Sequence, residues 1–158
     1  MFRRHFENRA SALLRFLCLV LDILPSSSRI VDRCEVARTI RNHSTIKEAW
    51  NIKQLVCIAD QVSKFNTSAE VTRLNSQRSV GIYQIPSRFY CRDQLPAEGQ
   101  AGLCHKLCGS YLDDNIVDDV RCAAIAYKRA GFRFWKVWYH QCYLNKEINS
   151  YIEGCDMN

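Results

Sequence analysis

Four aspartates stand within seven positions of one short stretch, YLDDNIVDDV at residues 111–120. They are Asp113, Asp114, Asp118 and Asp119. Because like charges this close repel one another, the stretch needs a neutralising partner. One interpretation is a calcium site, since calcium takes about six to eight hard oxygen ligands and dense carboxylates raise its affinity. The alternative is an acidic helix start, in which one aspartate caps the helix and acids favour its positive end.

Length and composition bound the kind of protein that carries this stretch. A chain of 158 residues fits one domain, and 47% apolar residues with 6 glycines and 3 prolines favour a globular protein with a core. The formal net charge of +6 comes without a long basic run or a nucleic-acid motif. We therefore expect no nucleic-acid partner.

The first 28 residues differ from the rest. A basic stretch, MFRRHFENRASALLR, precedes a short apolar run, FLCLVLDIL, and the small polar residues PSSS. This order is typical of a secretory signal peptide and predicts cleavage after Ser28, which leaves residues 29–158 as an extracellular domain. The alternative, a membrane anchor, needs about 18 apolar residues, more than this run contains. We therefore expect no membrane span.

The cysteine content agrees with export. The chain has nine cysteines, and Cys18 lies in the predicted signal peptide. The other eight are an even number, which in an exported chain indicates four disulfides. Cys104 and Cys108, in CHKLC, would suit a metal clamp in a cytosolic protein, but the export signal favours disulfides here.

Helices are predicted at both ends of the mature chain. Apolar residues recur at helical spacing in RCEVARTIRN, AWNIKQLVCIADQV and IVDDVRCAAIAYKR, and FWKVWYHQC suggests a final short helix. Residues 66–100 are more polar and contain glycine and proline, with GIYQI as the best candidate for a short strand. This arrangement predicts an α+β fold with a small sheet region between the helices.

The spacing of the eight cysteines, together with CEVA, WNIKQLVC, FNT, GIYQIPSR and WKVWYHQC, resembles the C-type lysozyme and α-lactalbumin family, glycoside hydrolase family 22. The resemblance covers residues 29–158. It implies a lysozyme-like fold that is mostly helical, with a small antiparallel sheet. The disulfide pairing that it implies is Cys34–Cys155, Cys57–Cys142, Cys91–Cys108 and Cys104–Cys122.

The resemblance also locates the family's catalytic positions. Lysozyme uses one carboxylic acid to protonate the leaving oxygen and a second carboxylate to support the positive sugar centre. Here the acid position holds Val62, in VSKFNT, and the second position holds Ser79, in RSVGIYQI. Neither can do this chemistry near neutral pH, so no catalytic residue and no muramidase activity are expected. Asp60 lies about 200° around the helix from Val62, and Glu70 lies in the following loop, so neither is a convincing substitute.

The implied glycan cleft is partly kept and partly altered. Gln84, Phe89, Tyr90 and Trp135 fall where the family binds sugars. Pro86 falls where the family uses a backbone N–H to hold an N-acetyl group, and proline lacks that donor. Packing of the cleft wall is the alternative role for Trp135, so the resemblance leaves glycan binding open.

The resemblance gives the acidic stretch a ligand set. In calcium-binding members of the family, three aspartate side chains and two backbone carbonyls hold the ion in a loop of this length. Asp113, Asp118 and Asp119 take the side-chain positions, and Ser110 and Asn115 take the carbonyl positions. We expect calcium as a structural cofactor.

These features predict a secreted, monomeric recognition protein that binds an N-acetylglucosamine-containing glycan or an extracellular protein. One alternative is an active glycoside hydrolase that cleaves peptidoglycan with a displaced acid. Another is an α-lactalbumin-like modulator of a glycosyltransferase. YKRAGFRFWKVWYH could be a membrane-active cationic patch, or its aromatic residues could be buried and its bases solvated. Asn42 and Asn66 stand in N-glycosylation sequons.

Overall fold

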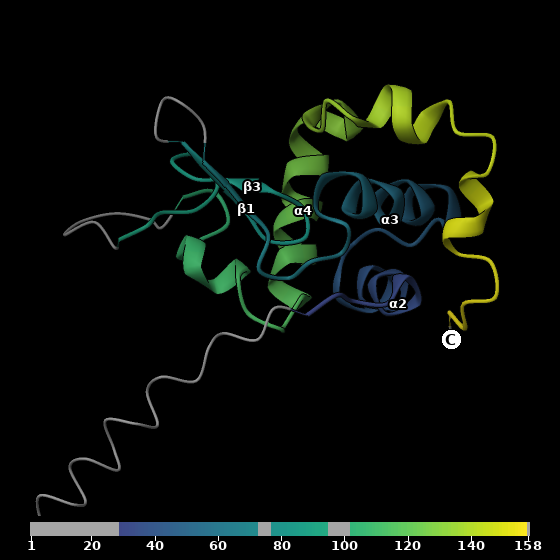
Figure 1. Ribbon diagram of the computed structural model, residues 1–158, viewed down its shortest axis with the longest axis horizontal. Coiled ribbons are helices and arrows are strands. Elements are labelled where there is room, and N and C mark those ends of the chain that lie inside the picture. Colours follow the sequence, from purple (N-terminus) through teal and green to yellow (C-terminus); the bar gives the residue numbers. More distant parts are fainter. Residues whose placement is uncertain (1–28, 73–76, 95–101, 158) are drawn as a thin grey trace, which may run out of the picture.

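The computed structural model describes residues 29–72, 77–94 and 102–157, so the predicted signal peptide lies outside the described residues. Helices make up one side of the molecule and a small sheet the other, with α4 between them (Figure 1). This is the α+β, lysozyme-like arrangement that the sequence predicted.

Three α-helices and four short helices are present in the described part of the chain. None of them combines the length and apolar character needed to cross a bilayer. The α-helices are α2 (Arg33–His43), α3 (Ala49–Ser63) and α4 (Val117–Ala130), and the short ones are η1 (Cys108–Tyr111), η2 (Gly131–Phe134), η3 (Trp138–Tyr143, a π-helix) and η4 (Ile148–Tyr151).

The first two helices follow from local sequence signals. Asp32 caps α2, because its side chain accepts a hydrogen bond from the backbone N–H of Cys34 at 2.9 Å. The apolar residues at helical spacing in α2 are buried, and those of α3 form the centre of the core. α3 ends where Lys64 takes a left-handed conformation.

The sheet contains β1 (Glu70–Thr72), β2 (Arg78–Val80) and β3 (Ile85–Pro86), all antiparallel and in that order. Val71 pairs with Ser79, and Ser79 pairs with Pro86. Since paired residues point to the same face of a sheet, this register puts the three side chains in one row.

The strand predicted over GIYQI is wrong for most of its length. Residues 81–84 form a turn between β2 and β3, and only Ile85 belongs to a strand. Gly81 and Gln84 have φ values of 74° and 51°, and the N–H of Gln84 donates to the carbonyl of Gly81 at 3.1 Å. Ile82 and Tyr83 in this turn are fully buried, and burial alone gives a short apolar run that resembles a strand.

The predicted final helix over FWKVWYHQC is shorter than expected. η2 ends at Phe134, and the chain turns before η3 begins at Trp138. Residues 135–137 therefore connect η2 to η3, and the carbonyl of Val137 accepts a hydrogen bond from the N–H of Gln141 in η3 at 2.9 Å.

Four disulfides join Cys34 to Cys155, Cys57 to Cys142, Cys91 to Cys108 and Cys104 to Cys122. This is the pairing that the resemblance implies. The bridge from Cys57 ties α3 to η3, and the bridge to Cys122 ties α4 to the loop that follows the sheet.

Candidate functional site

A cleft of about 380 Å³ lies between the end of α3 and the sheet. Val62 comes from the last turn of α3, and Ser79 comes from the middle of β2, where the strand register places Val71 and Pro86 on either side of it. η2 and the segment after it supply the remaining side. The residues that line the cleft are Gln61, Val62, Val71, Ser79, Gln84, Pro86, Phe134, Trp135, Lys136 and Val137.

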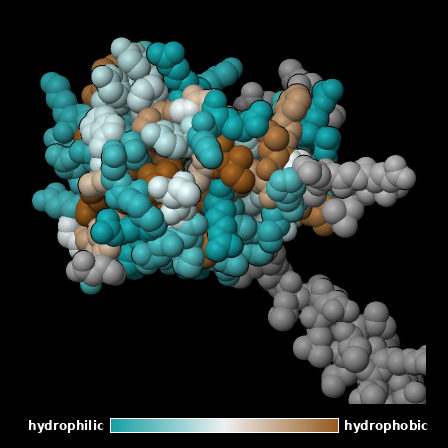
Figure 2. All heavy atoms as spheres, turned by 180° about the vertical axis from the view of Figure 1, so that it is seen from behind, coloured by the Kyte–Doolittle hydropathy of each residue, from teal (hydrophilic) through white to brown (hydrophobic). Residues whose placement is uncertain are grey.

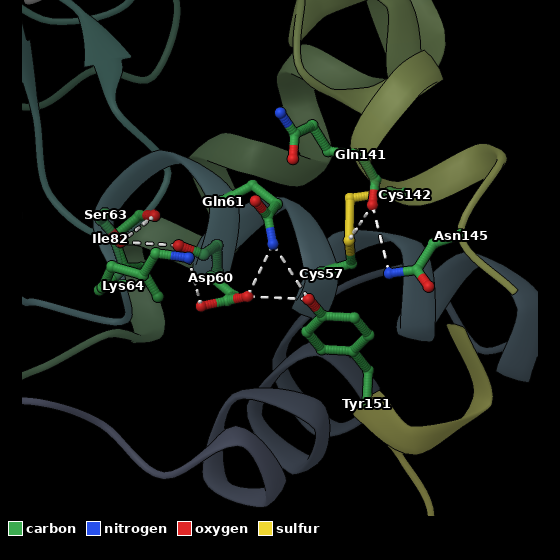
Figure 3. A network of polar contacts seen from close by, with 11 residues as sticks. Cys57, Asp60, Gln61, Ser63, Lys64, Ile82, Gln141, Cys142, Asn145 and Tyr151 are labelled. Atoms are coloured by element: carbon green, nitrogen blue, oxygen red, sulfur yellow. Dashed lines mark hydrogen bonds and ion pairs between the residues drawn. A yellow bond between two sulfur atoms is a disulfide. The ribbon is translucent and has the colours of Figure 1, made fainter. Parts of the chain in front are cut away.

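No aspartate or glutamate is among these lining residues in the described chain. Asp60, two residues before Val62, belongs to a separate polar network (Figure 3). Its carboxylate accepts hydrogen bonds from Tyr151 Oη and Gln61 Nε2, each at 2.8 Å, and pairs with Lys64 Nζ at 3.2 Å. The helical rotation expected between Asp60 and Val62 therefore separates Asp60 from the cleft.

Glu70, the other acid considered as a substitute, is held by an arginine on the neighbouring strand. Arg78 donates from Nε and Nη2 to the two oxygens of Glu70, at 2.7 and 3.1 Å, and from Nη1 to Asp93 at 2.6 Å. This bidentate pair uses both carboxylate oxygens of Glu70.

Two predicted cleft residues, Gln84 and Trp135, line the cleft, but their N–H groups bond within the protein. Trp135 is 5% exposed, and its Nε1 donates to the carbonyl of Tyr83 at 3.0 Å. The amide of Gln84 donates to the carbonyls of Ala69 and Gly81, at 3.0 and 3.1 Å. Both side chains therefore hold the cleft wall in place.

Phe89 and Tyr90 do not contribute to the lining of this cleft. Phe89 is 59% exposed, whereas Tyr90 is buried and contacts the ring of Phe134 edge-on, with centroids 5.0 Å apart. Tyr90 thus supports Phe134, which does line the cleft.

The aromatic and basic residues of YKRAGFRFWKVWYH separate by burial. Phe132 and Trp135 are buried, while Lys128, Arg129, Arg133 and Lys136 are exposed. On the face shown in Figure 2, hydrophobic residues appear in small groups between hydrophilic ones. The bases are therefore solvated and two of the rings are buried, whereas Tyr139 in the same stretch is 49% exposed.

The acidic stretch carries two neighbouring carboxylates with little access to solvent. Asp119 is 1% exposed, and its Oδ1 accepts one hydrogen bond, from the N–H of Ile82 at 3.2 Å. Asp118 Oδ1 is buried with no hydrogen-bond partner in the described residues. Burial and the charge of Asp118 raise the pKa of Asp119 well above its ordinary value, and burial raises the pKa of Asp118. A bound cation would satisfy both groups.

The other predicted ligands have different surroundings. Asp113 is exposed, and its Oδ1 accepts a hydrogen bond from the N–H of Asn115 at 2.8 Å, while Ser110 lies in η1. In the described residues, no group of three or more histidine, cysteine or acidic side chains is close enough to hold a metal. The donor set still fits calcium chemically, since every predicted ligand atom is an oxygen. The structure brings Asp118 and Asp119 together, whereas Asp113 bonds within the loop.

Two residues that the sequence did not single out border this loop. Lys106 Nζ lies 3.9 Å from Asp118 Oδ2. A Cβ atom at Gly81 would overlap Asp119 Oδ1 and lie 2.5 Å from the carbonyl of Tyr111. Glycine is therefore required where the turn at residues 81–84 contacts the acidic loop, by which we mean residues 111–120 including the first turn of α4.

Comparison with known proteins identifies the family of this chain. The model of the C-type lysozyme/alpha-lactalbumin family matches residues 29–155. The chain belongs to the C-type lysozyme/α-lactalbumin family. It is 32% identical to lysozyme C-3 of Sus scrofa over 147 residues, which cover 91% of this chain and 98% of that protein. It is 33% identical to lysozyme C of Semnopithecus entellus over 147 residues, covering 90% and 97% of the two chains.

Nothing in the sequence of this C-type lysozyme family member indicated that Lys106 and Gly81 lie next to Asp118 and Asp119. Lys106 lies in CHKLC, where only the cysteines were informative, and Gly81 was assigned to a strand. Their contacts with Asp118 and Asp119 join segments far apart along the chain, and the Cys104–Cys122 disulfide holds one of these segments against α4. Only the folded chain places them at the acidic loop.

Proposed function

We propose that this chain is a secreted member of the C-type lysozyme family that binds a ligand in its cleft without hydrolysing peptidoglycan. The observation that carries the proposal is that Val62 and Ser79, which the resemblance assigns to the family's two acid positions, both line the cleft. Hydrolysis of the family type needs a proton donor and a second carboxylate. Valine has no ionisable proton, and serine is uncharged near neutral pH.

The surroundings of the two nearest acids support the same proposal. Asp60 accepts hydrogen bonds from Tyr151 and Gln61 and forms an ion pair with Lys64. Glu70 forms an ion pair with Arg78. A displaced acid would have to leave one of these networks before it could reach a substrate. The active hydrolase is therefore the weaker hypothesis.

Restoring the two carboxylates tests the proposal. We expect the oxidised wild-type protein to leave peptidoglycan uncleaved, and Val62→Glu with Ser79→Asp to produce measurable lysis. The matched control is Val62→Gln with Ser79→Asn, which has nearly the same shape but no acid and should remain inactive. Lysis by the wild-type protein above the level of this control would contradict the proposal.

The sequence suggests two ligand classes, an N-acetylglucosamine-containing glycan and an extracellular protein. Calorimetric titration with N-acetylglucosamine oligomers separates them, with the cell contents checked afterwards for cleaved sugar. Binding without cleavage would assign the cleft to a glycan. Absence of binding would direct the search to other ligands.

Calcium is proposed as a structural cofactor of the acidic loop. Asp113, Asp118 and Asp119 would hold it through their side chains, and Ser110 and Asn115 through their carbonyls. When bound, the ion would neutralise the buried carboxylates and order the loop. The unpartnered Asp118 Oδ1 and the buried Asp119 support this assignment.

A further inference from the structure

The cleft is mainly apolar and large enough for a small molecule. Its volume of about 380 Å³ lies within the range of roughly 300–1,000 Å³ usual for ligand sites, which are also mostly apolar. Four of the lining residues are polar or charged, namely Gln61, Ser79, Gln84 and Lys136. The apolar lining comes from Val62, Val71, Pro86, Phe134, Trp135 and Val137.

The side-chain N–H groups of this lining, lysine aside, are already used. Both protons of the Gln84 amide are donated to backbone carbonyls, and both protons of the Gln61 amide are donated to Asp60 and Tyr151. The single indole proton of Trp135 is donated to the carbonyl of Tyr83. Pro86 has no backbone N–H. A neutral oligosaccharide, which needs many hydrogen-bond donors, would therefore find few in this cleft.

The charge of the lining has one sign. Lys136 is the only charged side chain among the described lining residues, and it is exposed at the cleft. With Val62 and Ser79 at the positions that the resemblance assigns to the family's two carboxyl groups, the described lining of the cleft lacks the ionised carboxylate that would repel an anion. Because the nearby acids Asp60 and Glu70 are paired elsewhere, they do not neutralise Lys136.

We propose that the cleft binds a ligand with an apolar body and one anionic group, with the body on the apolar lining and the anion at Lys136 Nζ. This inference rests on the proposed function, since it requires a cleft that binds without hydrolysis. It favours hydrophobic carboxylates or similar anions over the neutral sugars that the sequence suggests as ligands.

A pair of probes that differ in charge tests this inference. Calorimetric titration of the oxidised protein uses phenylbutyrate, its neutral amide and tri-N-acetylchitotriose. We expect phenylbutyrate to bind about tenfold more tightly than the amide, because a charge-assisted hydrogen bond is stronger than a neutral one. Chitotriose should bind more weakly than phenylbutyrate.

Replacing one lysine in the lining and one arginine outside it tests whether the preference for the anion depends on Lys136. Lys136→Gln should reduce the preference for the anion to about twofold or less, whereas Arg133→Gln, with the same loss of charge outside the lining, should leave it unchanged. Val62→Glu, which puts a carboxylate into the cleft, should weaken phenylbutyrate binding. These three results together would support the inference.

Several outcomes would overturn it. Equal affinity for phenylbutyrate and its amide, tighter binding of chitotriose, no binding of any probe, or an anion preference that survives Lys136→Gln would each be incompatible with the inference. Tighter binding of intact chitotriose would leave the proposed non-hydrolytic function standing. Cleavage of chitotriose would contradict the proposed function itself.

Discussion

At the scale of single residues, the proposed loss of hydrolysis rests on Val62 and Ser79, which both line the cleft. A positioned acid typically accelerates a reaction by about 10²–10⁴-fold, and an alkyl side chain supplies none of this. Nearby, Gln84 and Trp135 keep hydrogen bonds to the turn at residues 81–84. The wall and the chemistry therefore depend on different side chains.

Tyr83, in the same turn, gives a residue-scale prediction about pH. Its side chain is fully buried, and burial, with a smaller contribution from Asp119, raises its pKa well above the ordinary value. Above about pH 10 the unfolded chain loses the tyrosine proton and the folded chain keeps it. Because the folded state then binds more protons, its free energy of unfolding should fall as pH rises, by up to about 1.4 kcal/mol per pH unit.

Unfolding in denaturant at several pH values above 10 measures this slope. Tyr83→Phe should reduce the slope, and Tyr143→Phe, which removes an exposed hydroxyl, should not. Near pH 7, Tyr83→Phe should change the free energy of unfolding by less than about 1 kcal/mol, because the Tyr83 hydroxyl has no hydrogen-bond partner in the described residues. A loss of more than about 2 kcal/mol would contradict this assignment.

At the scale of elements, the loop between η1 and α4 tests the helix-cap interpretation of the aspartates. The N-cap of α4 is Ile116, which makes no side-chain capping bond, so neither Asp113 nor Asp114 caps this helix. Asp118 and Asp119 lie in the first turn of α4, where acids are favoured, and Asp119 is 1% exposed. The prediction that Asp113 or Asp114 caps the helix is wrong, whereas the acids at its positive end agree with the helix-start interpretation. Calcium binding stays a prediction.

The calcium proposal predicts that calcium bound to the acidic loop stabilises the folded protein. With calcium at about 100 times its dissociation constant, the free energy of unfolding should exceed that in chelator by about 2.7 kcal/mol. Asp119→Asn should abolish the difference, and Asp114→Asn, outside the proposed ligand set, should retain it. Thermal unfolding in calcium and in chelator provides the measurement, and equal midpoints for the wild-type protein would exclude a structural calcium site.

At the scale of the whole molecule, the disulfides connect segments that are far apart in the sequence. Cys34 and Cys155 are separated by 121 positions, and their bridge joins the start of α2 to the chain end beyond η4. Cys104 and Cys122 are separated by only 18 positions. The two bridges should therefore constrain the unfolded chain to different degrees.

Paired substitutions test this difference. Loop-closure entropy predicts a loss of about 5 kcal/mol for Cys34→Ala with Cys155→Ala, and about 3 kcal/mol for Cys104→Ala with Cys122→Ala. Urea unfolding of the two double variants measures both losses. A larger loss for the shorter loop would show that local packing, including the acidic loop next to Cys122, outweighs chain entropy.

Several features of this protein were already determined by its sequence. Cysteine spacing and the motifs between the cysteines indicated the family, and the resemblance to that family implied the disulfide pairing and the lysozyme-like fold. The helices followed from apolar spacing, since one buried face repeats every 3.6 residues. The prediction that Val62 and Ser79 stand at the family's two acid positions also came from the sequence, through the resemblance.

The tertiary structure decided which side chains meet. It showed GIYQ as a buried turn, because a short apolar run looks the same in a strand and in a buried turn. It left Phe89 and Tyr90 outside the cleft lining and placed Lys136 in it. It also showed that the amide protons of Gln61 and Gln84 and the indole proton of Trp135 are donated to acceptors within the protein. The contacts of Trp135 with Tyr83 and of Gln61 with Tyr151 join segments far apart along the chain, and therefore only the packed molecule determines them.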